Sequence, residues 1–247
     1  MRVLSKNNKV LLADGQAIKW QSGNDTPLKV LTKNNKLLLA DGQAFRNLKL
    51  PAAYQQVAYV QVAQSIPAYI DLKIPYDNGG SFEIGITYAG ASLPFGVFYD
   101  TKRFRVSLGV DANWFNVGIS SSANIYARYA DLTAGSNYTI KGSAKGTTVT
   151  AEIPELSLSN TYTMNSSYIA WNSAENLWLF GVHRTTIGNW GTRTIRYFKY
   201  WDKDDNLLRD MMPCYRKSNN VIGMFDLVSQ TFFTNAGTGV FTVGEDI

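Results

Sequence analysis

The chain has 247 residues, of which 45% are hydrophobic and 17% are charged, and its formal net charge is +5. This balance is typical of a globular protein and excludes an intrinsically disordered chain. No apolar run approaches the roughly 20 residues that a membrane helix requires, and residues 1–8 lack the apolar core of a signal peptide. We therefore expect a soluble protein that is made in a cytosol and does not insert into a membrane.

The positive charge is concentrated at the N-terminus. Residues 1–50 contain nine Lys or Arg and three Asp, a net charge of +6, whereas the other 197 residues contain 15 basic and 16 acidic side chains. A basic segment can dock on an acidic surface or on nucleic acid, or it can remain a solvated repeat. We expect no nucleic-acid partner.

An internal repeat covers residues 3–19 and 30–46, which read VLSKNNKVLLADGQAIK and VLTKNNKLLLADGQAFR and share 13 of 17 positions. Such a repeat indicates a duplicated structural unit. In each copy an Asn-Asn turn, a short Leu-rich strand and an Asp-Gly turn predict a β-hairpin. Residues 20–29 are predicted to be the linker between the copies.

The two hairpins predict an attachment or oligomerisation region over residues 1–47. A lone hairpin of this size is not stable in water, so its leucines must be buried against the twin hairpin, a sister subunit or a larger assembly. The predicted contact residues are the repeated leucines and lysines, namely Leu11, Leu12, Leu38, Leu39, Lys6, Lys9, Lys33 and Lys36.

Residues 48–247 are predicted to be a single all-β domain. Phe82, Ile84, Ile86 and Tyr88 alternate with polar residues, which places them on one face of a strand. Many short strands of this kind, without a convincing helix of three turns, indicate a sandwich or a barrel. Further strands are predicted at 57–63, 68–74, 95–99, 103–108, 112–119, 124–130, 137–142, 147–153, 168–171, 177–183, 193–202, 207–213, 222–227 and 231–234.

Several motifs resemble a known family. Residues 50–61 (LPAAYQQVAYVQ) and 69–71 (YID) resemble the opening of a concanavalin A-like, or laminin-G-like, domain that is widespread in phage and prophage structural proteins of gut bacteria. Residues 212–218 (MPCYRKS), 221–227 (VIGMFDL) and 232–239 (FFTNAGTG) resemble the C-terminal part of that domain more strongly. The resemblance implies a concanavalin A-like jelly-roll sandwich and a role in a phage particle.

The resemblance covers roughly residues 50–75 and 177–247, whereas 76–176 agree only in strand pattern. Residues 63–68 (AQSIPA) depart from the small-residue stretch that the family has before its Tyr-Ile-Asp step. We therefore transfer no ligand to that edge. The single cysteine, Cys214, is expected to be a buried free thiol, with a bond to another chain as the alternative.

Nothing in the sequence predicts catalysis. Glu152 and Glu155 flank Pro154 instead of alternating along one strand, so they do not form the carboxylate array of a sandwich glucanase. His183 is the only histidine, and no Gly-x-Ser-x-Gly elbow accompanies it. We expect no enzymatic activity, no cofactor and no bound metal.

An acidic cluster at residues 202–205 is interpreted as a hairpin turn, with a cation site as the alternative. Sugar contacts are predicted instead in a glycine-rich loop, where Trp190 could stack on a sugar while Asn189, Arg193 and His183 supply hydrogen bonds. The alternative is that Trp190 packs over the sandwich end. Trp114 is a further candidate contact. The remaining strand tryptophans are interpreted as core residues: Trp171, Trp178 and Trp201.

The combination of an N-terminal anchor and a displayed sandwich favours a phage virion structural protein, such as a head fibre, a decoration protein or a tail-adhesin subunit. Its location would be the virion, and its partners would be other virion proteins, bound through residues 1–47, and sister copies in a homo-oligomer such as a trimer. A dedicated adhesin for host or mucus glycans is the alternative, and a polysaccharide depolymerase is the third hypothesis.

Overall fold

A computed structural model describes the chain at residues 9–11, 17–19, 37–38, 44–45, 50–64, 66–99, 102–108, 115–119, 124–127, 132–163, 170–183 and 191–247. The chain divides into two compact units, Met1–Leu48 and Lys49–Ile247. No described helix is long and apolar enough to cross a membrane.

The first unit contains the two repeated hairpins that the sequence predicts. Strand β1 (Lys9–Leu11) pairs antiparallel with β2 (Ala17–Lys19), and β3 (Leu37–Leu38) pairs with β4 (Ala44–Phe45). Leu11 lies opposite Ala17, and the equivalent Leu38 lies opposite Ala44, so both copies have the same register. The hairpin prediction is therefore confirmed. The other predicted attachment residues lie outside the described residues: Leu12, Leu39, Lys6, Lys33 and Lys36.

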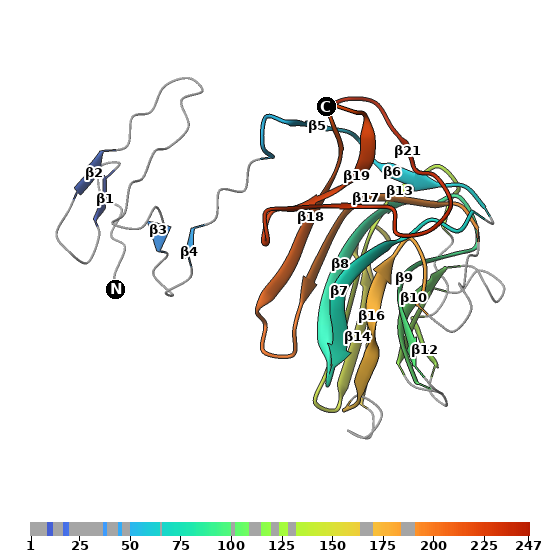
Figure 1. The fold of residues 1–247 in the computed structure, drawn as a ribbon. Coiled ribbons are helices and arrows are strands. Elements are labelled where there is room, and N and C mark those ends of the chain that lie inside the picture. The colour runs from blue at the N-terminus through green and yellow to red at the C-terminus, as the bar shows by residue number, and fades with distance from the viewer. Residues whose placement is uncertain are drawn as a thin grey trace. The chain divides into compact units, whose positions relative to one another are not determined.

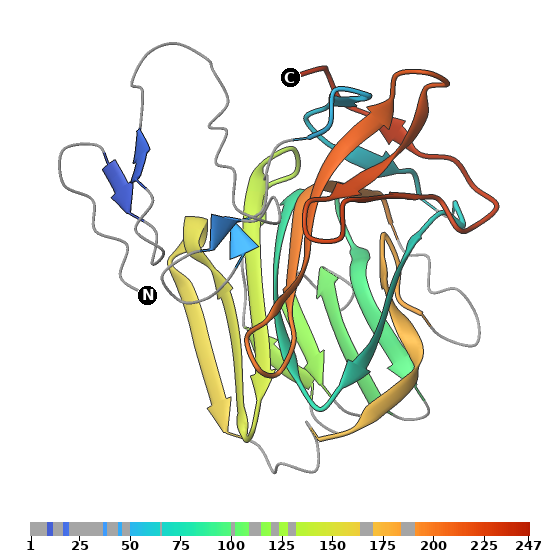
Figure 2. The ribbon, with the colours of Figure 1, turned by 60° about the vertical axis from the view of Figure 1, so that its left-hand side comes forward.

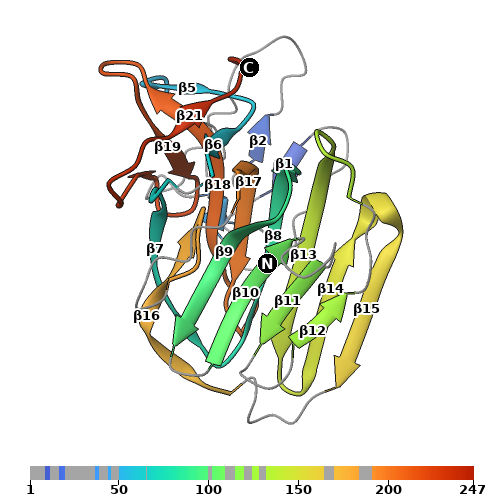
Figure 3. The ribbon, with the colours of Figure 1, turned by 90° about the vertical axis from the view of Figure 1, so that its right-hand side faces the viewer.

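The second unit is an antiparallel sandwich of two sheets (Figures 1 and 3), which confirms the predicted all-β jelly-roll fold. The smaller sheet has the strand order β12-β11-β10-β9-β16-β7. Its strands are β7 (Ile70–Asp77), β9 (Ser92–Tyr99), β10 (Lys102–Leu108), β11 (Phe115–Ile119), β12 (Asn124–Ala127) and β16 (Asn172–Leu179).

The larger sheet has the main order β15-β14-β13-β8-β17-β18-β19-β20, and the neighbours β15, β14 and β13 can be followed in Figure 2 from yellow to yellow-green. Strands β5 (Tyr54–Gln56), β6 (Val60–Val62) and β21 (Thr242–Val243) extend it at one end. Its main strands are β8 (Gly80–Thr87), β13 (Asn137–Lys145), β14 (Thr148–Ile153), β15 (Leu158–Thr163), β17 (Arg193–Trp201), β18 (Leu207–Arg216), β19 (Val221–Asp226) and β20 (Thr231–Thr234).

The core lies between the sheets and follows the predicted alternation. Phe82, Ile84 and Ile86 of β8 are buried, as is Tyr88 just after the strand. Phe95 of β9 is central, because its ring packs against several aromatic rings at centroid distances of 4.9–5.9 Å, namely those of Phe82, Phe104 and Phe198. The contacts with Phe82 and Phe198 join the two sheets across their inner faces.

The lone cysteine, Cys214, is a buried free thiol, as predicted. It packs in a small second cluster with Phe225 and Leu227. Burial raises the pKa of this thiol to about 12, although a hydrogen bond to the backbone of Phe225 acts in the opposite direction. The thiol is therefore protonated and unreactive at neutral pH.

Several strand predictions differ from the structure, and the short strand β5 (Tyr54–Gln56) was not predicted. Strand β15 was not predicted, because its sequence LSNTYT is an uncharged edge strand without apolar alternation. The separate strands predicted at 168–171 and 177–183 are wrong within the described residues, since one strand, β16, occupies Asn172–Leu179. No α-helix occurs among the described residues, and the single 3-10 turn covers Pro154–Leu156.

We expect Phe95→Ala to lower the free energy of unfolding by about 3–5 kcal/mol, because it removes a fully buried ring and leaves a cavity between the sheets. Urea unfolding followed by tryptophan fluorescence measures this. A loss below about 1 kcal/mol would show that the rings around Phe95 do not form the packed centre of the sandwich.

Candidate functional site

The outward side chains of the larger sheet form rows that cross the strands, because residues in register on antiparallel neighbours point to the same face. One row, here called the charged row, consists of five half-buried residues, Glu152, Lys141, Glu83, Lys199 and Asp210. Adjacent members are direct partners on β14, β13, β8, β17 and β18. Their charges therefore alternate across five neighbouring strands.

The charged row is held by its own electrostatics. Lys141 Nζ lies 3.5 Å from Glu83 Oε2. Burial raises the pKa of the Asp210 carboxyl, while the neighbouring Lys199 ammonium acts in the opposite direction. Each lysine is in register with an acidic residue on both neighbouring strands, so the row sets two positive charges beside three negative ones.

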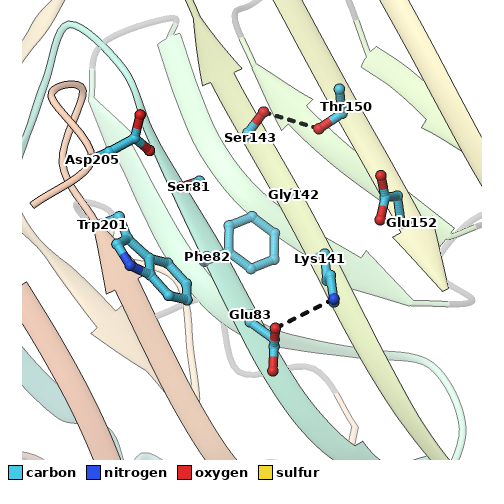
Figure 4. A pocket seen from close by; sticks show the side chains of 10 residues that line it. All are labelled: Ser81, Phe82, Glu83, Lys141, Gly142, Ser143, Thr150, Glu152, Trp201 and Asp205. Atoms are coloured by element: carbon cyan, nitrogen blue, oxygen red, sulfur yellow. Dashed lines mark hydrogen bonds and ion pairs between the residues drawn. The ribbon is translucent and has the colours of Figure 1, made fainter. Parts of the chain in front are cut away.

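The adjacent row, here called the hydroxyl row, consists of Thr150, Ser143 and Ser81 and ends on Trp201. Ser143 Oγ and Thr150 Oγ1 lie 2.9 Å apart and share a hydrogen bond. The hydroxyl row lines a shallow depression of about 290 Å³ on the outer face of the sheet, together with three members of the charged row, Glu152, Lys141 and Glu83. Figure 4 shows the indole of Trp201 on one side of it and the Lys141–Glu83 pair beside it.

The turn between β17 and β18 forms the rim of the depression. Asp202 Oδ1 accepts hydrogen bonds from the backbone N–H groups of Asp204 and Asn206, each at 2.9 Å. Although partial burial opposes it, these hydrogen bonds and the side chain of Asn206 lower the pKa of Asp202. The turn presents Asp205, which pairs with Lys145 of β13. The predicted hairpin turn is confirmed.

Tyr197 lies in the next row and covers Gly85 of β8. A Cβ atom at Gly85 would stand 2.3 Å from Tyr197 Cε1, so the glycine makes room for the ring to lie across the strand. Tyr197 donates a hydrogen bond from its hydroxyl to Thr139 Oγ1 at 3.1 Å. On this face the hydroxyl row and the charged row are thus followed by a row in which the ring of Tyr197 covers Gly85 and reaches Thr139.

His183, predicted to contact a ligand, makes its contacts within the chain. Its Nδ1 lies 3.0 Å from the carbonyl oxygen of Asn176, and its Nε2 lies 3.0 Å from Glu175 Oε2. Its ring stacks on Trp178 at 3.9 Å between centroids, and Trp178 stacks on Tyr69 at 3.7 Å. Both ring nitrogens thus already have partners in the smaller sheet.

Arg193, another predicted contact, is buried with 1% of its surface exposed. It donates a hydrogen bond from Nη2 to the carbonyl oxygen of Ile66 at 2.9 Å, while Nε and Nη1 have no partner among the described residues. Burial lowers its pKa to about 10. Arg193 therefore offers no exposed donor. The other predicted contacts, Trp190, Asn189 and Trp114, lie outside the described residues.

Trp171 and Trp178 are buried, as predicted, but the prediction that Trp201 is a core residue is wrong. Trp201 is half-exposed and lines the depression because Phe198 and Tyr200 take the inward positions of β17. Residues two positions apart on a strand point to the same face, so the charged Lys199 is the sequence signal that could have placed Trp201 outward. The described residues contain no group of three or more His, Cys, Asp or Glu that could hold a metal ion.

Comparison with known proteins finds neither a family model nor a curated protein that matches the chain. The fold is similar to that of the heptameric SAP-like pentraxin of Limulus polyphemus, with 10% identity, a TM-score of 0.49, and coverage of 76% of this chain and 95% of that one. Mouse laminin α1 domains LG4-5 give 16% identity, a TM-score of 0.44, and coverage of 66% and 46%.

The enzymatically active domain of tailspike protein 2 of bacteriophage CBA120 gives 11% identity, a TM-score of 0.40, and coverage of 68% of this chain and 31% of the tailspike chain. The chain therefore spans less than half of the laminin and tailspike chains that it matches. At these identities the likeness is one of fold, and the ligands and activities of those proteins do not carry over to this chain.

We expect Arg193→Met to raise the free energy of unfolding by about 1–3 kcal/mol, because a buried guanidinium without a carboxylate is destabilising. The carbonyl oxygen of Ile66 keeps a partner, since it also accepts from the N–H of Ala68. Urea unfolding at pH 7 measures the difference.

The gain should shrink as the pH rises above about 10, because folded Arg193 then loses its proton while the unfolded chain retains it. A variant less stable than the parent at pH 7 would contradict this interpretation and would show that the free guanidinium nitrogens have partners in solution.

Proposed function

We propose that this chain is a structural subunit of a bacteriophage particle, attached through residues 1–47, and that its sandwich displays a glycan-binding face. The observation that carries the glycan proposal is the depression, in which an outward indole, Trp201, stands beside a row of hydroxyls and a row of alternating charges. The particle assignment is supported by the duplicated hairpins and by the motifs at 212–239 that resemble phage structural proteins.

The depression has the chemistry that a sugar requires. An indole ring stacks on the apolar C–H face of a pyranose, while carboxylates accept hydrogen bonds from its hydroxyls and an ammonium group donates to its oxygens. The lining side chains stand on four paired strands, β14, β13, β8 and β17, and on the turn after β17, so the positions of these groups are set before a ligand arrives. A preorganised site of this kind loses little conformational entropy on binding.

The same face does not favour hydrolysis. Glu83 and Glu152 stand two strands apart, on the order of 10 Å at the usual strand spacing, which is at or beyond the upper limit for a pair of glycosidase carboxylates. Lys141 lies between them in register and pairs with Glu83, so it occupies the place that a scissile bond or an attacking water would need. We therefore propose a non-enzymatic role, which sugar release from a capsule or mucin would contradict.

The hairpins support attachment because their described strands are very short. Strands β1 and β2 have three residues each, and β3 and β4 have two. Isolated two-stranded hairpins are marginal in water, so Leu11, Leu38 and their repeated neighbours require a partner surface. We propose other virion proteins and sister copies, in a homo-oligomer, as that surface, with the virion as the location.

We expect Trp201→Ala to weaken glycan binding about tenfold, because it removes the stacking surface while the sheet remains paired. A glycan array identifies a ligand, and calorimetry then compares the variant with the parent. Tyr215→Ala is the matched control, since Tyr215 is an outward aromatic on β18 that does not line the depression. Equal losses in both variants, or unchanged affinity in Trp201→Ala, would refute this choice of site.

We expect deletion of residues 1–47 to leave a folded sandwich that no longer joins the phage particle, because the core lies within the second unit. Circular dichroism and sedimentation measure folding and oligomeric state, and co-purification with particles measures attachment. Unfolding of the shortened chain would show that the first unit is part of the sandwich, and retained attachment would place the anchor elsewhere.

A further inference from the structure

We infer that the ligand of the depression is an uncharged glycan that lies along the rows, across the strands of the larger sheet. This inference rests on the proposed glycan-binding function and adds the class of glycan and its direction. It follows from the order of charges on the face, which the pairing of β14, β13, β8, β17 and β18 determines.

Positive and negative charges on this face compensate one another. The three carboxylates of the charged row alternate with two ammonium groups, and at the rim Asp205 pairs with Lys145. No lysine of the row stands beyond the reach of a carboxylate on a neighbouring strand, at a spacing of about 4.8 Å. Among the described residues that line it, the depression therefore presents strong donors and strong acceptors, and its one lysine, Lys141, is paired with Glu83.

The alternating charges disfavour glycans that carry many charges of one sign. A polyanionic glycan, such as a chain of uronates, would bring its carboxylates against Glu83, Glu152 or Asp210 at every second strand, and like charges repel. A polycationic chain would meet Lys141 and Lys199 in the same way. A sugar hydroxyl is both a donor and an acceptor, so neutral hexoses can satisfy both kinds of group.

The rows also indicate the direction in which a glycan chain would lie on the sheet. Along a strand the outward chemistry changes at every second residue, as from Ser81 to Glu83 to Gly85 on β8. Along a row the kind of side chain recurs, because hydroxyls follow one another in the hydroxyl row and carboxylates recur at every second strand in the charged row. A polymer of similar units keeps the same contacts only in the second direction. Its chain would have the hydroxyl row on one edge, the charged row on the other, and a residue stacked on Trp201.

The class of glycan is tested with the full chain and neutral hexaoses of glucose, mannose and galactose, compared with hexagalacturonate. We expect at least one neutral hexaose to bind, with an affinity that changes less than about twofold between low and high salt, and no binding of the uronate. Preference for hexagalacturonate overturns the inference while the proposed function stands. Absence of binding to any glycan overturns the proposed function itself.

A charge swap tests the cause. Glu83→Gln/Glu152→Gln leaves Lys141 without a carboxylate on either neighbouring strand and leaves Lys199 beside Asp210 alone. We therefore expect it to gain salt-sensitive binding of hexagalacturonate and to bind the neutral hexaose more weakly. Glu175→Gln/Glu245→Gln is the matched control, because it removes two charges at exposed positions outside the depression. An equal gain in the control would mean that net charge, and not the charged row, selects the ligand.

The direction is tested by ligand length. Thr150→Ala lies three strands from Trp201 in the hydroxyl row, so we expect it to weaken binding of the hexaose severalfold and to leave the disaccharide unchanged. Asn137→Ala, which lies on the same strand as Ser143 but further along it, should affect neither. The opposite result, with Asn137 sensitive and Thr150 insensitive, would place the glycan along the strands.

Discussion

The register of β8 is the constraint on which the core and the candidate site both depend. This strand pairs with β13 on one side and β17 on the other over nearly its whole length. Its inner face places Phe82, Ile84 and Ile86 in the core, and the same pairing sets Ser81 and Glu83 in the outer rows. A slip of one residue would exchange the two faces, so burial of the inner face fixes the outer one.

A β-bulge in β17 makes this arrangement possible. Ile195 pairs with Ile86 and faces inward, yet Phe198, an odd number of residues later, also faces inward. The extra residue, Arg196, is exposed, and the register shifts between Ile195 and Tyr197. Beyond the bulge, Lys199 and Trp201 face outward.

Without that extra residue the faces of β17 would be exchanged. Lys199 would then point into the core and Phe198 into solvent. Because of the bulge, apolar residues on both sides of Arg196 face the core. Lys199 and Trp201 can then both face outward. A local irregularity of the backbone therefore determines that Trp201 lines the depression of the candidate site.

Two buried charged side chains in the second unit, Asp226 and Arg193, differ in how fully their hydrogen-bonding groups have partners. The Asp226 carboxylate is fully buried, yet it accepts hydrogen bonds from the backbone of Asp210, Val228 and Ser229. These donors replace water around the carboxylate and tie the β19–β20 turn to β18. Arg193 has a single acceptor, so its burial is not compensated in the same way. The polar groups of the proposed site belong to neither case, since they are half-buried and remain accessible to a ligand.

The sequence by itself determined the all-β class, the repeated hairpins, the inward face of β8 and the burial of Cys214, because these follow from alternation, turn residues and composition within short segments. It could also indicate the turn at 202–205, where Asp202 caps its own neighbours. Strand β15 was not predicted because this uncharged edge strand lacks the alternation of apolar and polar residues that marks a strand. The candidate site was missed for another reason. Its residues come from five strands that are separated in the sequence by up to 127 positions, from Glu83 to Asp210.

Only the tertiary structure decided which outward residues meet. Pairing β8 with β13 and β17 brings Lys141 and Lys199 to either side of Glu83, and no local pattern encodes that pairing. Parity with Lys199 puts Trp201 on the same side of β17 as that lysine, whereas the bulge at Arg196, which lies where β17 pairs with β8, sets the phase of this segment relative to the inward Ile195. Local chemistry thus specified the elements, while long-range register, enforced by burial of the inner face, assembled the site.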